Sequence, residues 1–288
     1  DTLTSPRYDV KFDGATDDRA ALVQLLAVAA ANATKLSPGV VRLESDYIAA
    51  PTYAEVSDGI TFDPALVLFD GQGHTLDYST KTSGAFSAVQ LNATYDADLN
   101  TQAMYSAVKG LGNLLILMPS YTVNASGIGL HIQDPTGSGG SYRAPLGTVQ
   151  DVAIMGGNAA LTLGQGVFGW EFERVRFGHG ASNTLNYAVH SPSPRADTEF
   201  DKFRGGFIAN AQVAFKYAVG YALVSSINID GCKTIIDLTG TGMLNFTQGY
   251  SEFTDGDNTQ PKFNNADANA HTQVSNWSFN FRTASFGA

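Results

Sequence analysis

The chain has 288 residues, of which 43% are hydrophobic and 15% are charged, and this balance excludes an intrinsically disordered protein. A formal net charge of −10 argues against nucleic acid or an anionic membrane surface as a partner, because both would repel it. The single cysteine, Cys232, can form neither an internal disulfide nor a cysteine-rich metal site, and the sequence predicts no metal and no cofactor.

Residues 17–33 are the one segment with a convincing helical pattern. Alanine and leucine, the strongest helix formers, dominate the segment; Thr16 is a candidate N-cap, and Asp17 and Asp18 suit the positive end of the helix dipole. The segment is apolar on almost all sides, so we expect most of its surface to be covered. It is too short to span a bilayer, and we expect no membrane insertion.

From residue 37 onward the pattern changes to short apolar runs that end at Gly, Asn, Asp or Ser, such as Val40–Leu43, Leu66–Phe69 and Leu114–Leu117. No helical segment separates these runs, which argues against an alternating βα protein and indicates an all-β fold.

The runs repeat imperfectly, with an apolar residue, two polar or small residues, and then an alternating pair of apolar residues. The frame predicts tight turns at Asn113, Asp151, Arg174, Lys202, Ser226 and Asn276. A repeating unit with variable insertions is typical of a parallel β-helix, in which successive coils stack about 4.8 Å apart. We expect buried columns formed by Val152, Val175, Phe203 and Ile227, and by Ile154, Phe177 and Ile229.

This interpretation divides the chain into an opening strand and capping helix (1–36) and a coil stack (37–288), with the longest loop insertion at 249–272. The helix is placed to cover the N-terminal end of the stack, whose open backbone groups would otherwise invite aggregation. The abrupt last residues suggest a truncated C-terminal end, which another subunit or a missing segment would cover.

Residues Tyr8–Gln24 combine a short strand, an acidic glycine-containing turn, Thr-Asp-Asp and a helix that begins with Ala-Ala. This segment, with residues 37–48 and 68–76, resembles the first coils of pectate-lyase-superfamily right-handed parallel β-helices, especially bacteriophage tailspikes and capsule depolymerases. The turn before Thr16 is shorter here, and Glu44-Ser45-Asp46 replaces the usual Pro and Gly. The resemblance implies a single-stranded right-handed parallel β-helix, a homotrimer, a bacterial surface polysaccharide as ligand, and a location on a virion tail or outside the cell. It transfers no catalytic residues.

In the repeat frame, Glu173 lies over Asp201 and Arg176 over Arg204 in the adjacent coil. Two carboxylates about 5 Å apart cannot both ionise freely, and a protonated acid beside a carboxylate is the apparatus of glycoside hydrolysis. We therefore predict Glu173 and Asp201 as catalytic residues. The alternative is that these charges only form surface ion pairs. The predicted substrate-binding residues are Arg176, Arg204, His179, Trp170 and Tyr187.

The leading functional hypothesis is tailspike-like binding and hydrolytic depolymerisation of a bacterial surface polysaccharide. One alternative is a uronate lyase or epimerase, which needs a cation to neutralise the uronate carboxylate and a base to take its α-proton. Another is a trimeric receptor-binding module without catalytic activity.

Overall fold

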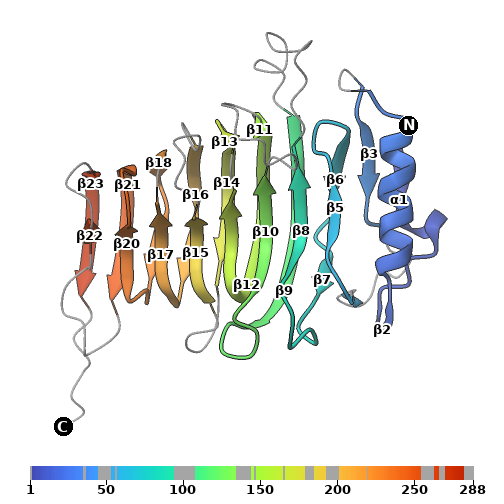
Figure 1. Cartoon of the computed structure of the whole chain (residues 1–288), viewed down its shortest axis with the longest axis horizontal. Coiled ribbons are helices and arrows are strands. Elements are labelled where there is room, and N and C mark those ends of the chain that lie inside the picture. Colours follow the sequence, from blue (N-terminus) through green and yellow to red (C-terminus); the bar gives the residue numbers. More distant parts are fainter. Residues whose placement is uncertain are drawn as a thin grey trace.

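The computed structural model describes residues 2–34, 37–44, 53–55, 57–93, 108–133, 144–145, 147–164, 166–178, 185–192, 201–218, 220–253, 263–265 and 270–281. The described residues form a parallel β-helix, which confirms the predicted fold class: all pairings between its strands are parallel. The coils follow one another along the long axis of the molecule (Figure 1).

The pairings arrange the strands in three stacks, whose outward surfaces we call the first, second and third faces. The first face consists of β1 (Thr2–Thr4), β3 (Gly39–Arg42), β6 (Val67–Asp70), β18 (Tyr221–Ser225) and the first parts of the long strands β9 (Val108–Ser120), β12 (Gly147–Leu163), β14 (Glu171–Phe177), β16 (Asp201–Ala209), β21 (Met243–Phe253) and β23 (His271–Phe281).

The long strands bend at a corner and continue on the second face. There they are joined by β2 (Asp13–Asp17), β4 (Tyr53–Glu55), β7 (Thr75–Asp77) and β19 (Asn228–Asp230). The third face consists of the last part of β12 with β5 (Ile60–Phe62), β8 (Phe86–Asn92), β10 (Gly127–Gln133), β15 (Leu185–Ser191), β17 (Ala211–Tyr217), β20 (Thr234–Leu238) and β22 (Phe263–Asn265). Strands β11 (Ala144–Pro145) and β13 (Val167–Phe168) pair separately.

The corner between the first and second faces is made by residues in the left-handed backbone region, with φ of 53° at Asn113, 55° at Asp151 and 51° at Arg174. Ser226 and Asn276 also have positive φ, so all but one of the predicted turn positions are confirmed. Lys202 is the wrong one, since it pairs with Glu171 within the sheet. The corner of that coil is Gly205, with φ 65°, because glycine adopts positive φ without the strain of a Cβ atom.

Inward side chains stack from coil to coil and form the core. One column contains Phe172 and Phe203, whose rings stack with centroids 4.6 Å apart. Phe203 was therefore predicted in the wrong column, and Gly206 lies beside Val175 in its place. The other predicted core residues are confirmed as buried: Val152, Val175, Ile227, Ile154, Phe177 and Ile229.

Helix α1 (Arg19–Ala31) covers the N-terminal end of the coil stack, as predicted (Figure 1). Its buried residues are Leu22, Leu25, Leu26 and Ala29, whose spacing defines a single stripe. The expectation that most of the helix surface is covered is wrong, since only this stripe is buried and Val23 is 40% exposed.

The helix begins after Asp18, and Thr16 is not its N-cap. Thr16 lies in β2, where its hydroxyl donates to Asp13 at 2.7 Å. The Asp18 carboxylate makes no capping bond to the helix. It instead accepts the backbone N–H groups of Lys11 at 2.8 Å and Phe12 at 3.1 Å, and so fixes the segment between the 3₁₀ helix η1 (Ser5–Tyr8) and β2 onto the start of α1.

The predicted insertion at 249–272 is partly strand. Strand β21 continues to Phe253, β22 covers Phe263–Asn265, and β23 begins at His271. Residues 254–262 and 266–269 lie outside the described residues.

Candidate binding face

One outward side chain from each coil forms a continuous row along the first face. Strands present alternate side chains outward, and neighbouring strands lie about 4.8 Å apart, so the row repeats at that spacing. The members of this first-face row, in order along the axis, are Arg42, Asp70, Gly112, Gln150, Glu173, Arg204, Ser225, Thr247 and Ser275.

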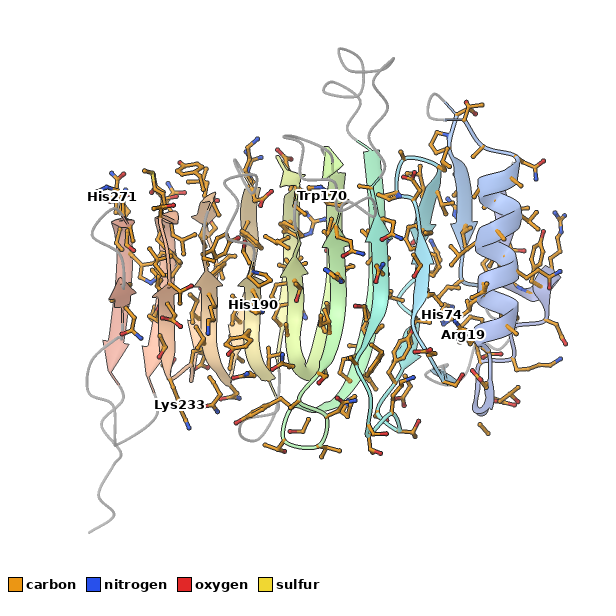
Figure 2. All side chains as sticks on the ribbon, viewed as in Figure 1. Arg19, His74, Trp170, His190, Lys233 and His271 are labelled. Atoms are coloured by element: carbon orange, nitrogen blue, oxygen red, sulfur yellow. The ribbon has the colours of Figure 1, made fainter. Side chains whose placement is uncertain are left out.

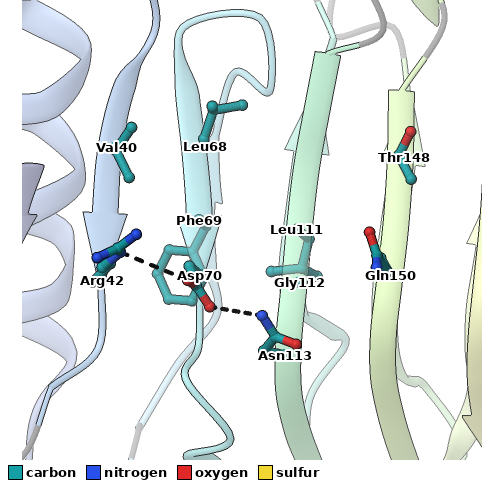
Figure 3. A pocket seen from close by; sticks show the side chains of 10 residues that line it. All are labelled: Val40, Arg42, Leu68, Phe69, Asp70, Leu111, Gly112, Asn113, Thr148 and Gln150. Carbon is teal, nitrogen blue, oxygen red and sulfur yellow. Dashed lines mark hydrogen bonds and ion pairs between the residues drawn. The ribbon is translucent and has the colours of Figure 1, made fainter.

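The row is hollowed at Gly112, where a groove of about 370 Å³ opens between β3 and β12 (Figure 3). Glycine contributes no side chain at this outward position, so the floor of the groove lies between Asp70 and Gln150. Val40, Leu68 and Thr148 line the wall on one side of the row. The groove therefore combines an apolar wall with groups that donate and accept hydrogen bonds, which is the usual composition of a ligand site.

Asp70 is held in place by its neighbours. Asn113 Nδ2 donates to Asp70 Oδ1 at 3.0 Å, and Arg42 Nε lies 3.7 Å from Oδ2 (Figure 3). Gln72 Nε2 also donates to Oδ2. Partial burial alone would raise the pKa of Asp70, but the hydrogen bonds from Asn113 and Gln72, together with Arg42, lower it below its ordinary value. Asp70 is thus an ionised acceptor at neutral pH.

Two ion pairs border the row. Lys202 Nζ lies 2.8 Å from Glu171 Oε1, and this hydrogen bond lowers the pKa of Glu171. Arg174 donates two hydrogen bonds of 2.7 Å to the Asp151 carboxylate, and these lower the pKa of Asp151. Both carboxyl groups are therefore ionised at neutral pH and unsuited to act as a general acid there.

Arg204 is exposed and lies beside Glu173 in the row. Among the residues that the structure describes, Arg204 makes no hydrogen bond or ion pair, while Glu173 Oε2 lies 3.8 Å from Arg174 Nη1. The row thus presents a guanidinium group with its donors available for a carboxylate, which it can bind through two parallel hydrogen bonds.

The predicted register of β14 and β16 is wrong. Glu173 lies beside Arg204 rather than Asp201, and Arg176 lies beside Phe207 on the second face rather than beside Arg204. The two coils are offset by three more residues than the sequence match indicated, since the corner is at Gly205. Because sides alternate back from that corner, Arg204 and Lys202 face outward and Asp201 faces inward.

Asp201 and Trp170 are both completely buried. The Trp170 backbone N–H donates to Asp201 Oδ1 at 3.0 Å, and the Trp170 indole occupies the space where a side chain at Gly147 would lie. Burial raises the pKa of Asp201 to about 8. In this conformation neither residue is within reach of a polymer that binds the outer surface, so the predicted acid lies in the core.

The remaining predicted residues are dispersed. Tyr187 is half-buried on the third face, and His179 lies outside the described residues. The first face therefore brings together Glu173 and Arg204 of the predicted set and adds Arg42, Asp70 and Gln150, which the sequence analysis missed. The signal for them was present, because the glycine at 112 stands at an outward position of the repeat frame.

A second hollow, of about 500 Å³, lies across the corner on the second face. It shares Asn113 with the groove, and its floor includes Leu115 and Ala153. Asp151, already paired with Arg174, stands at its rim.

Within the described part of the chain, no group of three or more His, Cys, Asp or Glu residues could hold a metal ion. None of the described helices is both long and apolar enough to cross a membrane.

No family model matches the sequence, and no curated protein matches it. Two solved structures of the Streptococcus pneumoniae surface adhesin PfbA are similar to this chain. The first has a TM-score of 0.47 and 11% sequence identity, and covers 98% of this chain and 86% of the adhesin chain. The second has a TM-score of 0.45 and 11% identity, and covers 97% of this chain and 79% of the adhesin chain. At this level of similarity neither structure informs the ligand of this protein.

Proposed function

We propose that this protein acts outside the cell as a polysaccharide-binding β-helix, with an acidic polymer lying along the first-face row. The observation that carries the proposal is the exposed guanidinium group of Arg204, which makes no hydrogen bond or ion pair within the described residues and lies in the same row as the hollow at Gly112. The first-face row repeats polar groups at each coil. It therefore suits an extended polymer better than a compact small molecule, since successive sugar units of the polymer can contact successive coils.

The charges of the face favour a carboxylate-bearing ligand at Arg204. Asp70 and Asp151 are each held by a donor or a cation of the protein, so they do not compete for Arg204. Glu171 is attracted by Arg204 as well, but its hydrogen bond goes to Lys202. The protein carries a net charge of −10, and a local cation free of its own partner offsets the resulting repulsion at this one position.

The proposal is tested by measuring binding to immobilised polygalacturonate, an acidic polysaccharide, at low and high salt. Arg204→Gln should weaken binding about tenfold, the loss typical of a charge-assisted hydrogen-bonded pair. Binding by the native protein should also weaken as salt screens the attraction.

The matched control is Arg7→Gln, which makes the same charge change at an exposed residue of η1, at the far N-terminal end. It should leave the affinity unchanged. Equal losses in the two variants, or no binding of the acidic polymer by the native protein, would contradict the proposed site.

Cleavage by hydrolysis has weaker support than binding. It needs a protonated acid beside the glycosidic bond, and Asp201, the predicted residue whose pKa is raised, lies in the core.

The register of β14 and β16 favours a second candidate, a uronate lyase, because the carboxylate of Glu173 lies beside the cation of Arg204. Lyase activity would appear as ultraviolet absorption of the unsaturated product, and hydrolysis as reducing ends without it.

The homotrimer, the bacterial origin of the polysaccharide and the virion tail location stay predictions. Light scattering of the purified protein measures the mass of the assembly and tests the first of them.

A further inference from the structure

The third face carries a second row of outward side chains, and its chemistry differs from that of the first face. Figure 2 labels one of its members, His190, near the middle of the coil stack. In order along the axis, the members of this third-face row are Thr61, Gln90, His131, Thr162, His190, Lys216, Asp237 and Asn264.

Most of these groups are uncharged. Burial lowers the pKa of His131, and burial together with the nearby Lys216 ammonium lowers the pKa of His190 to about 4. Both imidazoles are therefore neutral at physiological pH, and each can donate one hydrogen bond and accept another. Amide side chains extend the surface beside the row, as in the Asn186–Asn158 hydrogen bond of 2.9 Å.

The centre of the row is a cluster of four side chains on β15, β17 and β20. The Tyr187 and His190 rings lie 4.7 Å apart. Lys216 Nζ lies 4.8 Å from the centre of the Tyr187 ring and 3.4 Å from its hydroxyl oxygen. The distance from Lys216 Nζ to Asp237 Oδ2 is 3.8 Å, longer than a hydrogen bond. The ammonium and the carboxylate therefore both retain capacity for a further partner.

Thr162 is the buried member of this row. It lies between His131 and His190, it is only 4% exposed, and its hydroxyl oxygen has no hydrogen-bond partner within the described residues. Because that oxygen is itself buried, it does not reach a ligand on the outer surface, and the cluster carries the polar contacts of this face.

We propose that the third face binds a neutral, hydroxyl-rich glycan, with Lys216, Asp237 and His190 as the central polar contacts and Tyr187 beside them. A sugar hydroxyl both donates and accepts, so it can accept from Lys216 while it donates to Asp237. The two charges of the cluster cancel, and the rest of the row is uncharged, so a ligand with net charge gains little here. This site is separate from the acidic-polymer site proposed on the first face.

Binding to immobilised mannan and dextran, two neutral polysaccharides, tests the proposal. The native protein should bind at least one of them, and Lys216→Met should weaken that binding about tenfold. His190→Gln, which keeps a neutral donor and acceptor, should weaken it less than Lys216→Met. The affinity should change little with salt, because neither polymer is charged.

The matched control is Lys202→Met, which removes a lysine paired with Glu171 on the first face and should leave binding to neutral polymers unchanged. Thermal melting of each variant shows whether the fold is retained. Failure of the native protein to bind either polymer, or equal losses in Lys216→Met and Lys202→Met, would overturn the inference. The outcomes with neutral polymers are independent of polygalacturonate binding, which tests the site proposed on the first face.

Discussion

Asp201 has a carboxyl group in the interior of the coil stack. One oxygen accepts the Trp170 N–H at 3.0 Å, and the other is buried without a hydrogen-bond partner. Because burial disfavours the charged form, the pKa rises from 3.8 to about 8. Between those two values the unfolded chain loses the proton while the folded chain keeps it, so the stability should fall as the pH rises from about 4 to about 8 and should change no further above that.

Asp201→Asn removes this titration while its amide oxygen can still accept the Trp170 N–H. The difference in free energy of unfolding between variant and native protein should therefore shift in favour of the variant as the pH increases, measured by urea denaturation at pH 5 and pH 8. A difference in the free energy of unfolding that stays constant over that range would show that the carboxyl group titrates normally. Asp201 would then again be a candidate catalytic residue on the outer surface.

The candidate site could be predicted in part from single residues. Glu173 and Arg204 were correctly placed among outward positions, because alternation along a strand can be read from the sequence. Asp201 could not be placed, since its predicted face depended on matching Glu199–Gly205 to Glu171–Phe177. That match placed the corner at Lys202 instead of Gly205. Sides alternate back from the true corner, so Arg204 stays outward while Asp201 faces inward.

At the scale of the strand, the two adjacent glycines of β16 set the register. Gly206 has φ of 119°, and a Cβ atom there would lie 2.1 Å from the Val175 carbonyl oxygen. Gly206→Ala should therefore destabilise the protein by about 3 kcal/mol, through backbone strain and overlap with the adjacent coil. Thermal and urea denaturation measure the loss.

Gly205→Asn is the matched control one residue away. Gly205 has φ of 65°, and a Cβ atom at this position would lie 3.7 Å from its nearest neighbour, Arg174 Cγ, which is an ordinary contact distance. Asparagine tolerates this region of φ, so the variant should lose much less stability than Gly206→Ala. Similar losses in both variants would show that the corner, rather than the approach to Val175, limits substitution in this strand.

The corners explain why most strands of the first and second faces could be predicted. Asparagine, aspartate and serine are frequent where the backbone turns with positive φ, and Asn113, Asp151 and Ser226 all mark that corner. Comparable positions precede strands of the third face, with positive φ at Asn210 before β17 and at Gly231 before β20. Other strands of this face follow segments of variable length, so their register depends on contacts between coils that the local sequence does not encode.

At the scale of the whole molecule, each coil contacts mainly its neighbours, and stability is close to a sum over coils and their interfaces. Repetition made the architecture predictable from sequence, because a shared frame needs only a few matching copies. The distribution of polar residues over three faces depends instead on where every coil bends. One wrong corner at Lys202 therefore placed Arg204 beside Arg176 past the corner and Asp201 on the outer surface, and neither residue lies there.

The same near-neighbour stability predicts how the molecule responds when its N-terminal cover is weakened. Leu25 lies on the buried side of α1 and is completely buried. Leu25→Asp would place a charge in that apolar contact, at a cost of several kcal/mol in stability. Because the helix covers only the first coils, hydrogen exchange should accelerate first in β1, β3 and β6, while β15, β17 and β20 keep their protection.

Val23→Asp, on the exposed side of the same helix, should leave the exchange pattern unchanged. Uniform loss of protection along the stack in Leu25→Asp would mean that the coils unfold as one cooperative unit, and that α1 stabilises all of them rather than the end it covers.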